Sequence, residues 1–182
     1  MTPSTTQPPR RTPVRAVLAS WFGTVIEFYD FFIYGLASSL VFGRLFFPSF
    51  DPLVGTLIAL STFGVGYVAR PLGAIVFGHF GDRIGRKSML VVTLLMMGVS
   101  TTAIGLLPTY DAIGVAAPVL LVALRILQGL SLGGEYGGAV LMTIEHTSAE
   151  RRGFTGSLLN TGAGFGTLTS NLAFLAVLQL PE

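Results

Sequence analysis

The chain has 182 residues, of which 51% are hydrophobic and only 11% charged, and its mean hydropathy is +0.71. Soluble domains carry about a quarter charged residues, so this composition indicates a membrane protein. The formal net charge of +2 is too small to indicate a nucleic-acid partner. Because the chain contains no cysteine, disulfides and cysteine-ligated metals are excluded. No metal or other cofactor is expected.

Five hydrophobic runs follow one another along the chain, separated by short polar segments. Each has at least the ~20 mainly apolar residues that a helix needs to cross ~30 Å of hydrocarbon. Five such runs in succession disfavour the alternative of buried helices in a soluble protein. The sequence therefore predicts an all-α membrane protein, with a bundle over residues 16–182 and spans over residues 16–42, 53–77, 88–107, 115–143 and 154–180.

Residues 1–15 precede the first span and begin with the polar, proline-rich stretch MTPSTTQPP. Such a composition predicts a disordered tail. The first span is not a cleavable signal, because its apolar stretch exceeds the ~7–15 residues of a signal core. It also carries two acids, Glu27 and Asp30.

The basic residues indicate the orientation in the membrane. Eight of them lie on one side of the predicted spans, whereas only Arg44 lies on the other. Short loops rich in Lys and Arg stay in the cytoplasm, so the N-terminus is predicted to be cytoplasmic, in a multi-pass protein of the plasma or inner membrane. The eight residues are Arg10, Arg11, Arg15, Arg83, Arg86, Lys87, Arg151 and Arg152.

Ionisable residues also fall inside the predicted spans. A charge at the centre of a span costs at least ~2.5–3.5 kcal/mol, so such residues tend to pair or to line a watery cavity. Two interpretations remain open: structural ion pairs that lock helices together, or a path for substrate and protons. The residues are Glu27, Asp30, Arg70, Arg125 and Glu135.

Their spacing predicts which of these side chains share a surface. Glu27 and Asp30 are three residues apart, as are Arg125 and Gln128, so each pair lies on one helix face. Counted from the cytoplasmic side, Asp30 and Arg125 are expected to lie further out than the other three charges.

The chemistry of these residues favours transport of an anion or a zwitterion together with protons. An arginine fork matches a carboxylate in a bidentate manner. A carboxylate whose arginine partner comes and goes can take up and release a proton. The predicted substrate and proton path comprises Glu27, Asp30, Arg70, Arg125, Gln128 and Glu135.

Aromatic residues surround the first two acids, between residues 21 and 34. We assign Phe28, Phe31 and Phe32 to helix packing. Tyr34 lies one helical turn after Asp30 and is expected to line the same cavity.

Small residues spaced by four recur in the fourth and fifth spans. This spacing places them on one helix face, where another helix can approach closely. We therefore expect close helix packing along these faces. The residues are Gly129, Gly133 and Gly137 in the fourth span, and Gly156, Asn160 and Gly164 in the fifth, with Gly162 and Gly166 beside them.

The segment between the second and third spans, residues 78–87, reads GHFGDRIGRK. It predicts a tight, charged turn with one acid, three permanent cations and three glycines. Positive-inside topology alone would explain its cations. It would not explain Asp82 or the glycines.

Several of these motifs resemble those of the major facilitator superfamily. Residues 78–87 match its signature loop, G-x-x-x-D-R-x-G-R-[RK], at every defining position, and residues 125–135 resemble its fourth-span motif, R-x-x-Q-G-x-x-x-G-G-E. The pieces EFYDFFIY, ARPLGA and GGEYGGA resemble the metabolite:proton symporter branch, which includes carriers for proline and betaine, α-ketoglutarate, citrate and shikimate. The resemblance covers everything except the N-terminal tail.

The resemblance implies a secondary active transporter, a non-enzyme, built from twelve spans in two halves with the site between them. It also implies that Asp82 pairs near helix ends at a cytoplasmic gate, and that the neighbouring cations hold the closed state. The gate motif comprises Gly78, Asp82, Arg83, Gly85, Arg86 and Lys87.

The chain departs from that pattern by having five predicted spans in place of twelve. It is therefore expected to be an N-terminal fragment whose partners are the lipid bilayer, protons, a small organic acid or zwitterion, and the missing C-terminal half. A uniporter or antiporter on the same scaffold and a non-transporting membrane remnant remain alternatives. A membrane enzyme is disfavoured, because no metal-binding or nucleophile spacing surrounds Glu145, His146 and Ser148.

Overall fold

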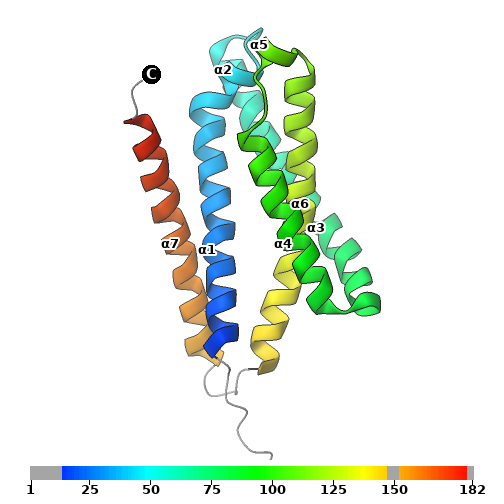
Figure 1. Cartoon of the computed structure of the whole chain (residues 1–182). Helices are drawn as coiled ribbons and strands as arrows, with labels where there is room; N and C mark the ends of the chain where they lie inside the picture. The colour runs from blue at the N-terminus through cyan, green and yellow to red at the C-terminus, as the bar shows by residue number, and fades with distance from the viewer. Residues whose placement is uncertain (1–13, 147–151, 180–182) are drawn as a thin grey trace, which may run out of the picture.

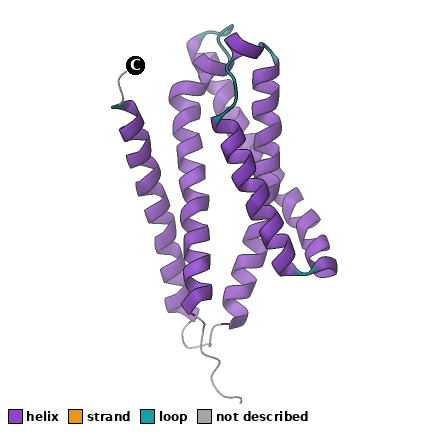
Figure 2. Cartoon of the chain, in the orientation of Figure 1, coloured by secondary structure: helices purple, strands orange, loops and turns teal. Residues whose placement is uncertain are grey.

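The structure, a computed structural model, describes residues 14–146 and 152–179 (Figure 1). Within these residues it is helical and contains no strand (Figure 2). Five helices among these described residues are long and apolar enough to cross a membrane, which confirms the predicted all-α class and the number of spans. The predicted tail lies almost entirely outside the described residues.

The five long helices are α1 (Val14–Ala37), α3 (Pro52–Ile84), α4 (Arg86–Gly105), α6 (Ala116–His146) and α7 (Arg152–Leu178). A π-helix, η1 (Ser38–Phe42), and the short α2 (Gly43–Phe46) continue from α1. The short α5 (Tyr110–Ile113) precedes α6.

The end of α3 differs most from the prediction. The second span was predicted to end at residue 77, before a turn over residues 78–87, but α3 continues through Ile84 and α4 begins at Arg86. Only Gly85 separates them, with a φ of 106°, a left-handed value that glycine adopts without a Cβ clash. The turn prediction was wrong because hydropathy marks where the apolar run stops, whereas the helix itself ends at the glycine.

The helices form two groups (Figure 1). In one group α3 packs along α6, and α4 also packs on α6; in the other, α7 packs along α1. Contacts of α1 with α3 and α6 are sparse. Near α2 and α5 an apolar core joins the groups, and it includes Tyr34, Phe46, Ala59, Ile104 and Leu121.

Glycines decide how closely α3 and α6 approach. A Cβ added to Gly129 would collide with the carbonyl oxygen of Gly66, and one added to Gly133 would collide with that of Arg70. The two backbones therefore touch, as the spacing on the fourth span predicted. The surroundings of Gly137 lie outside the described part of the chain.

On α7 the predicted contact face was wrong. Gly156 and Gly164 have open space where a Cβ would lie, whereas a Cβ on Gly166 would come within 2.5 Å of the Val25 carbonyl oxygen of α1. Gly162 faces α1 in the same way. Two interleaved sets of small residues run along this helix, and spacing alone does not show which set meets the neighbour.

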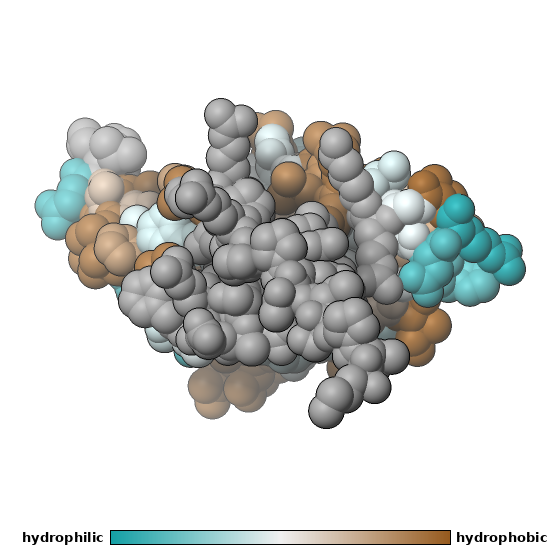
Figure 3. All heavy atoms as spheres, turned by 90° about the horizontal axis from the view of Figure 1, so that it is seen from below, coloured by the Kyte–Doolittle hydropathy of each residue, from teal (hydrophilic) through white to brown (hydrophobic). Residues whose placement is uncertain are grey.

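The flanks of the bundle are apolar. Large hydrophobic side chains such as Val68, Ile75 and Val99 are more than half exposed, as expected for surfaces that face lipid. Figure 3 shows the end of the bundle opposite α2 and α5. Hydrophobic residues (brown) lie around the edge of the bundle, and hydrophilic residues (teal) lie beside the corner between α3 and α4. This pattern agrees with helices that span a membrane and corners that reach water.

Replacement of Gly129 by alanine tests the close packing of α3 and α6. The added methyl group must push α3 away, so we expect Gly129→Ala to lower the free energy of unfolding by about 1–3 kcal/mol. Gly164→Ala is the matched control, because it adds the same methyl group in open space. Thermal unfolding of the full chain in micelles measures both. Equal midpoints for the two variants would contradict the close approach.

Candidate functional site

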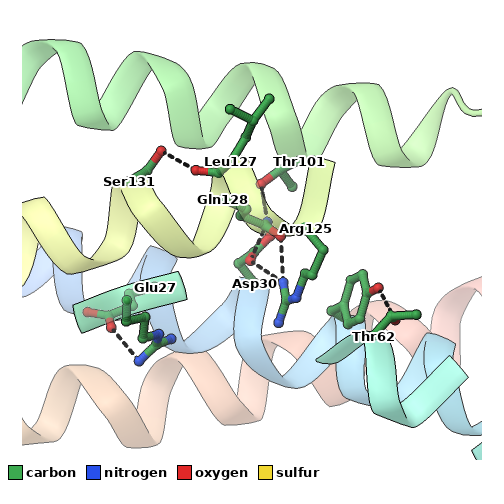
Figure 4. A network of polar contacts seen from close by, with 10 residues as sticks. Glu27, Asp30, Thr62, Thr101, Arg125, Leu127, Gln128 and Ser131 are labelled. Atoms are coloured by element: carbon green, nitrogen blue, oxygen red, sulfur yellow. Dashed lines mark hydrogen bonds and ion pairs between the residues drawn. The ribbon is translucent and has the colours of Figure 1, made fainter. Parts of the chain in front are cut away.

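A buried set of polar side chains meets between α1, α4 and α6 (Figure 4). Gln128 Nε2 donates to Asp30 Oδ2 (2.6 Å) and to Thr101 Oγ1 (2.8 Å). Thr101 Oγ1 in turn donates to Asp30 Oδ1 (3.0 Å). We call Asp30, Thr101, Arg125 and Gln128 the Asp30 network. Asp30 and Arg125 are only 4% and 3% exposed, so these charges depend on each other and on the network for stabilisation.

Arg125 joins the network through Gln128. Its Nη1 donates to Gln128 Oε1 at 2.5 Å but lies 3.7 Å from Asp30 Oδ2, beyond a normal hydrogen bond. The guanidinium carbon lies 3.8 Å from the ring centroid of Tyr34 and 5.0 Å from that of Phe63. The cation is therefore held by an amide oxygen and by two aromatic rings.

The surrounding helices make room for this arginine. Gly66 of α3 faces its stem, since a Cβ there would come within 2.8 Å of Arg125 Nε and 3.1 Å of Cγ. Thr62 Oγ1 donates to the Ala59 carbonyl (2.6 Å), so the Tyr34 hydroxyl donates to Thr62 (2.7 Å). That bond fixes the ring against which the guanidinium lies.

A second charged pair is more open. Arg70 Nη1 lies 3.7 Å from Glu27 Oε1, and the two side chains are 25% and 18% exposed. The Arg70 guanidinium lies 4.5 Å from the ring centroid of Tyr67 and 6.0 Å from that of Phe31. Together with Phe28 these residues line a small pocket that is partly open to its surroundings, which we call the Arg70 pocket.

The structure divides the predicted path in two. Glu27 meets Arg70 across α1 and α3, whereas Asp30 meets Arg125 and Gln128 across α1 and α6. One turn of α1 separates the two acids, so the buried network and the open pocket are neighbours with different access to solvent. Tyr34 lies against the Arg125 guanidinium, beside the Asp30 carboxylate, where its spacing had placed it.

No sequence signal marks Thr101, Phe63 or Tyr67, which the structure brings to these sites. A hydroxyl or a ring in an apolar span is common, and only packing shows which one meets a charge. Phe28 and Phe31 were assigned to helix packing alone. Phe31 does pack on Phe63, with ring centroids 4.7 Å apart, but both predicted packing residues also line the Arg70 pocket.

The gate motif lies at the corner between α3 and α4, about 18 Å along α3 from Arg70. Gly78, Asp82 and Arg83 are exposed, and Gly85 is the break between the helices. Some predicted residues have side chains outside the described part of the structure: Arg86, Lys87, Glu135, Glu145, His146 and Ser148. Among the described residues, no three His, Asp or Glu side chains come together in a way that could bind a metal ion.

Comparison with known proteins places these features in context. A family model described as "Sugar (and other) transporter" matches residues 16–180. The shikimate transporter of Escherichia coli K12 is 51% identical over 156 residues, which cover 86% of this chain and 36% of that transporter. The inner membrane metabolite transport protein YhjE of the same organism is 51% identical over 161 residues, 88% of this chain and 37% of the relative.

A proline/betaine transporter of Escherichia coli K12 is 44% identical over 153 residues, which cover 83% of this chain and 30% of the relative. The chain thus spans roughly a third of the length of these relatives. No solved structure matches the chain.

The two arginines should differ in their contribution to stability. Arg125→Met leaves the Asp30 carboxylate buried without its cation, so we expect it to lower the free energy of unfolding by about 3–5 kcal/mol. Arg70→Met, the matched control, removes a more exposed cation and should cost about 1 kcal/mol or less. Denaturant titration of the full chain in micelles measures both. Similar losses for the two variants would show that the Asp30 network is no more buried than the Arg70 pocket.

Proposed function

Because the chain belongs to the sugar (and other) transporter family of the major facilitator superfamily, we propose that it forms part of a secondary active transporter that couples proton entry to uptake of a small organic acid or zwitterion. The chain is a multi-pass membrane protein. Its 36% coverage of the shikimate transporter fits the expectation that it is one part of a longer transporter. The excess of basic residues on one side supports an N-terminus in the cytoplasm.

The observation that carries this proposal is the presence of two acid–arginine pairs whose charges are not directly hydrogen-bonded, one buried and bridged by Gln128 and one beside a pocket. In each pair the nearest nitrogen and oxygen are 3.7 Å apart. A structural lock would favour direct, hydrogen-bonded contact between the charges. The lack of a direct hydrogen bond between the charges favours the alternative in which they exchange partners during a transport cycle.

The Arg70 pocket is the proposed solute site. The carboxylate of a solute would replace Glu27 as the partner of Arg70 and accept two parallel hydrogen bonds from the guanidinium. The ammonium group of a zwitterion would then face Glu27 and the rings of Phe31 and Tyr67. Relatives named as shikimate and proline/betaine transporters fit the two classes of solute, an acid and a zwitterion.

Asp30 is the proposed proton-binding group. Its carboxylate is buried, and its attraction to Arg125 links α1 to α6, two helices that otherwise contact each other sparsely. Uptake of a proton would remove that attraction, so the two helix groups could move relative to each other. Glu135, which lies in α6, remains a second candidate for this role.

The gate motif has a separate proposed role. Asp82 and Arg83 lie in the last turn and a half of α3, at an exposed corner. Charges at helix ends can form contacts that break and re-form between moving bundles. We propose that these residues contact the other half of the transporter on the cytoplasmic side.

Uptake assays test the transport proposal. Cells that express the full reading frame are given labelled shikimate, proline or glycine betaine, and we expect uphill accumulation of at least one solute that a protonophore abolishes. Asp30→Asn should abolish uphill accumulation and leave solute exchange intact, because the proton-binding group is lost and the solute site is not. Glu135→Gln is measured in parallel.

The matched control is Asp111→Asn on α5, an exposed residue that belongs to neither site. It should accumulate solute like the unchanged protein. Full accumulation by both Asp30→Asn and Glu135→Gln would exclude these groups from proton coupling. The transport proposal itself would be contradicted if no solute in a wide panel of organic acids and betaines were taken up or caused proton movement.

Replacement of Asp82 tests the gate. We expect Asp82→Asn to lower the maximal rate of uptake about tenfold or more, which corresponds to the loss of one charge-assisted hydrogen bond. The solute concentration that gives half-maximal uptake should change little. Asp51→Asn is the control, because Asp51 caps α3 through Leu53 N (2.9 Å) and asparagine caps equally well. An Asp82→Asn protein with a normal maximal rate would remove the gate role.

A further inference from the structure

We propose that Gln128 is a neutral spacer that keeps Arg125 from pairing directly with Asp30, and so leaves the Asp30 carboxyl able to take up a proton. The inference rests on the proposed function only in naming Asp30 as the proton-binding group. It assigns Gln128 a positioning role between two charges.

The geometry places the Gln128 amide between the two charges (Figure 4). Gln128 Oε1 is 2.5 Å from Arg125 Nη1, and Gln128 Nε2 is 2.6 Å from Asp30 Oδ2, whereas the direct distance from Arg125 Nη1 to Asp30 Oδ2 is 3.7 Å. Gln128 is completely buried, so water does not compete for these bonds. The amide, and not the arginine, therefore provides the hydrogen bond to Asp30 Oδ2.

The charges on either side fix the orientation of the amide. If the amide were reversed, its NH₂ group would face the Arg125 cation and its oxygen would face the Asp30 carboxylate, giving two repulsive contacts. The bond from Gln128 Nε2 to Thr101 Oγ1 (2.8 Å) adds a third constraint in the observed orientation. A side chain held at three points is a rigid spacer.

Arg125 is poised to close the gap if the spacer is removed. Tyr34 and Phe63 hold the guanidinium, and Gly66 contacts the stem, so the side chain has little freedom to turn away. A shift of about 1 Å would bring its Nη1 within hydrogen-bond distance of Asp30. Direct pairing would strengthen the preference of that carboxyl for its charged form.

The donors around Asp30 also indicate which oxygen takes the proton. Oδ2 faces the Gln128 NH₂ group, which can only donate, so a proton on Oδ2 would oppose another hydrogen. Oδ1 faces the Thr101 hydroxyl, which can turn from donor to acceptor. A proton delivered by hydronium, which is left as water, therefore forms its new O–H bond at Oδ1, the carboxylate becomes neutral, and Arg125 keeps its charge.

Other groups near Asp30 do not replace this arrangement. The charged or titratable side chains that face it are Arg125 from α6, Arg70 from α3, and Glu27 and Tyr34 from α1 itself. α4 contributes the uncharged Thr101 hydroxyl, and the described side chains of α7, which packs along α1, include no ionisable group. Of these groups, only Arg125 is separated from Asp30 by the Gln128 amide.

Infrared titration of the full chain in detergent micelles tests the spacer. The C=O band of a protonated carboxyl is followed against pH and assigned to Asp30 by its loss in Asp30→Asn. Gln128→Met keeps the length of the side chain but removes both polar atoms, so Arg125 should pair directly with Asp30. We expect the midpoint of the band to move to lower pH by about one unit or more.

Thr101→Val is the matched control, because it removes a hydrogen bond from Asp30 and leaves the Gln128 amide bonded to Arg125 and to Asp30. Its midpoint should move to higher pH, opposite to that of Gln128→Met. An unchanged or higher midpoint in Gln128→Met would overturn the inference, since a plain hydrogen-bond donor would behave like Thr101. A position-30 carboxyl that never titrates in the unchanged chain would overturn it as well.

A second variant covers a failure of Gln128→Met to fold. Gln128→Asn has an amide one methylene shorter, which cannot reach both charges, so it must give the same shift to lower pH if the inference holds. The spectroscopic result is separate from transport. A shift in the Asp30 band, together with full uphill accumulation by Asp30→Asn, would support the spacer and overturn the role of Asp30 in proton symport.

Discussion

The free-energy cost of placing a charge in a bilayer constrains how the helices of this chain pack. Asp30 and Arg125 are buried in the interior of a five-helix bundle, and neither could remain charged there without polar partners. Gln128 and Thr101 supply hydrogen bonds, and Tyr34 supplies an aromatic face, so three helices must come together at one point. The polar network therefore joins α1, α4 and α6.

The rest of the packing divides the bundle into parts that are held together unequally. Glycines bring α3 against α6 and α7 against α1 at backbone contact, so each group is closely packed. Between the groups the contacts are sparse, apart from the apolar core near α2 and α5. The two acid–arginine pairs bridge this sparse interface. A change of charge at that interface is therefore well placed to alter how the groups sit together.

Much of the fold was predictable, and the errors have physical causes. Hydropathy reports which residues prefer lipid, so the five spans appear in the sequence, but α3 runs beyond its apolar stretch until Gly85 interrupts it. Spacing by four identifies small-residue faces, yet on α7 it favoured Gly156 and Gly164, whereas Gly162 and Gly166 meet α1. Neither hydropathy nor spacing contains information about the neighbouring helix.

The same distinction holds for the candidate site. Residue type and order are enough to establish that the chain crosses a membrane, that acids and arginines lie within its spans, and that it belongs with the major facilitator transporters. The packed helices were needed to show that Asp30 meets Arg125 through Gln128 while Glu27 meets Arg70 beside a pocket. Which charge meets which depends on helix rotation and close approach, and these are set by side chains from several helices at once.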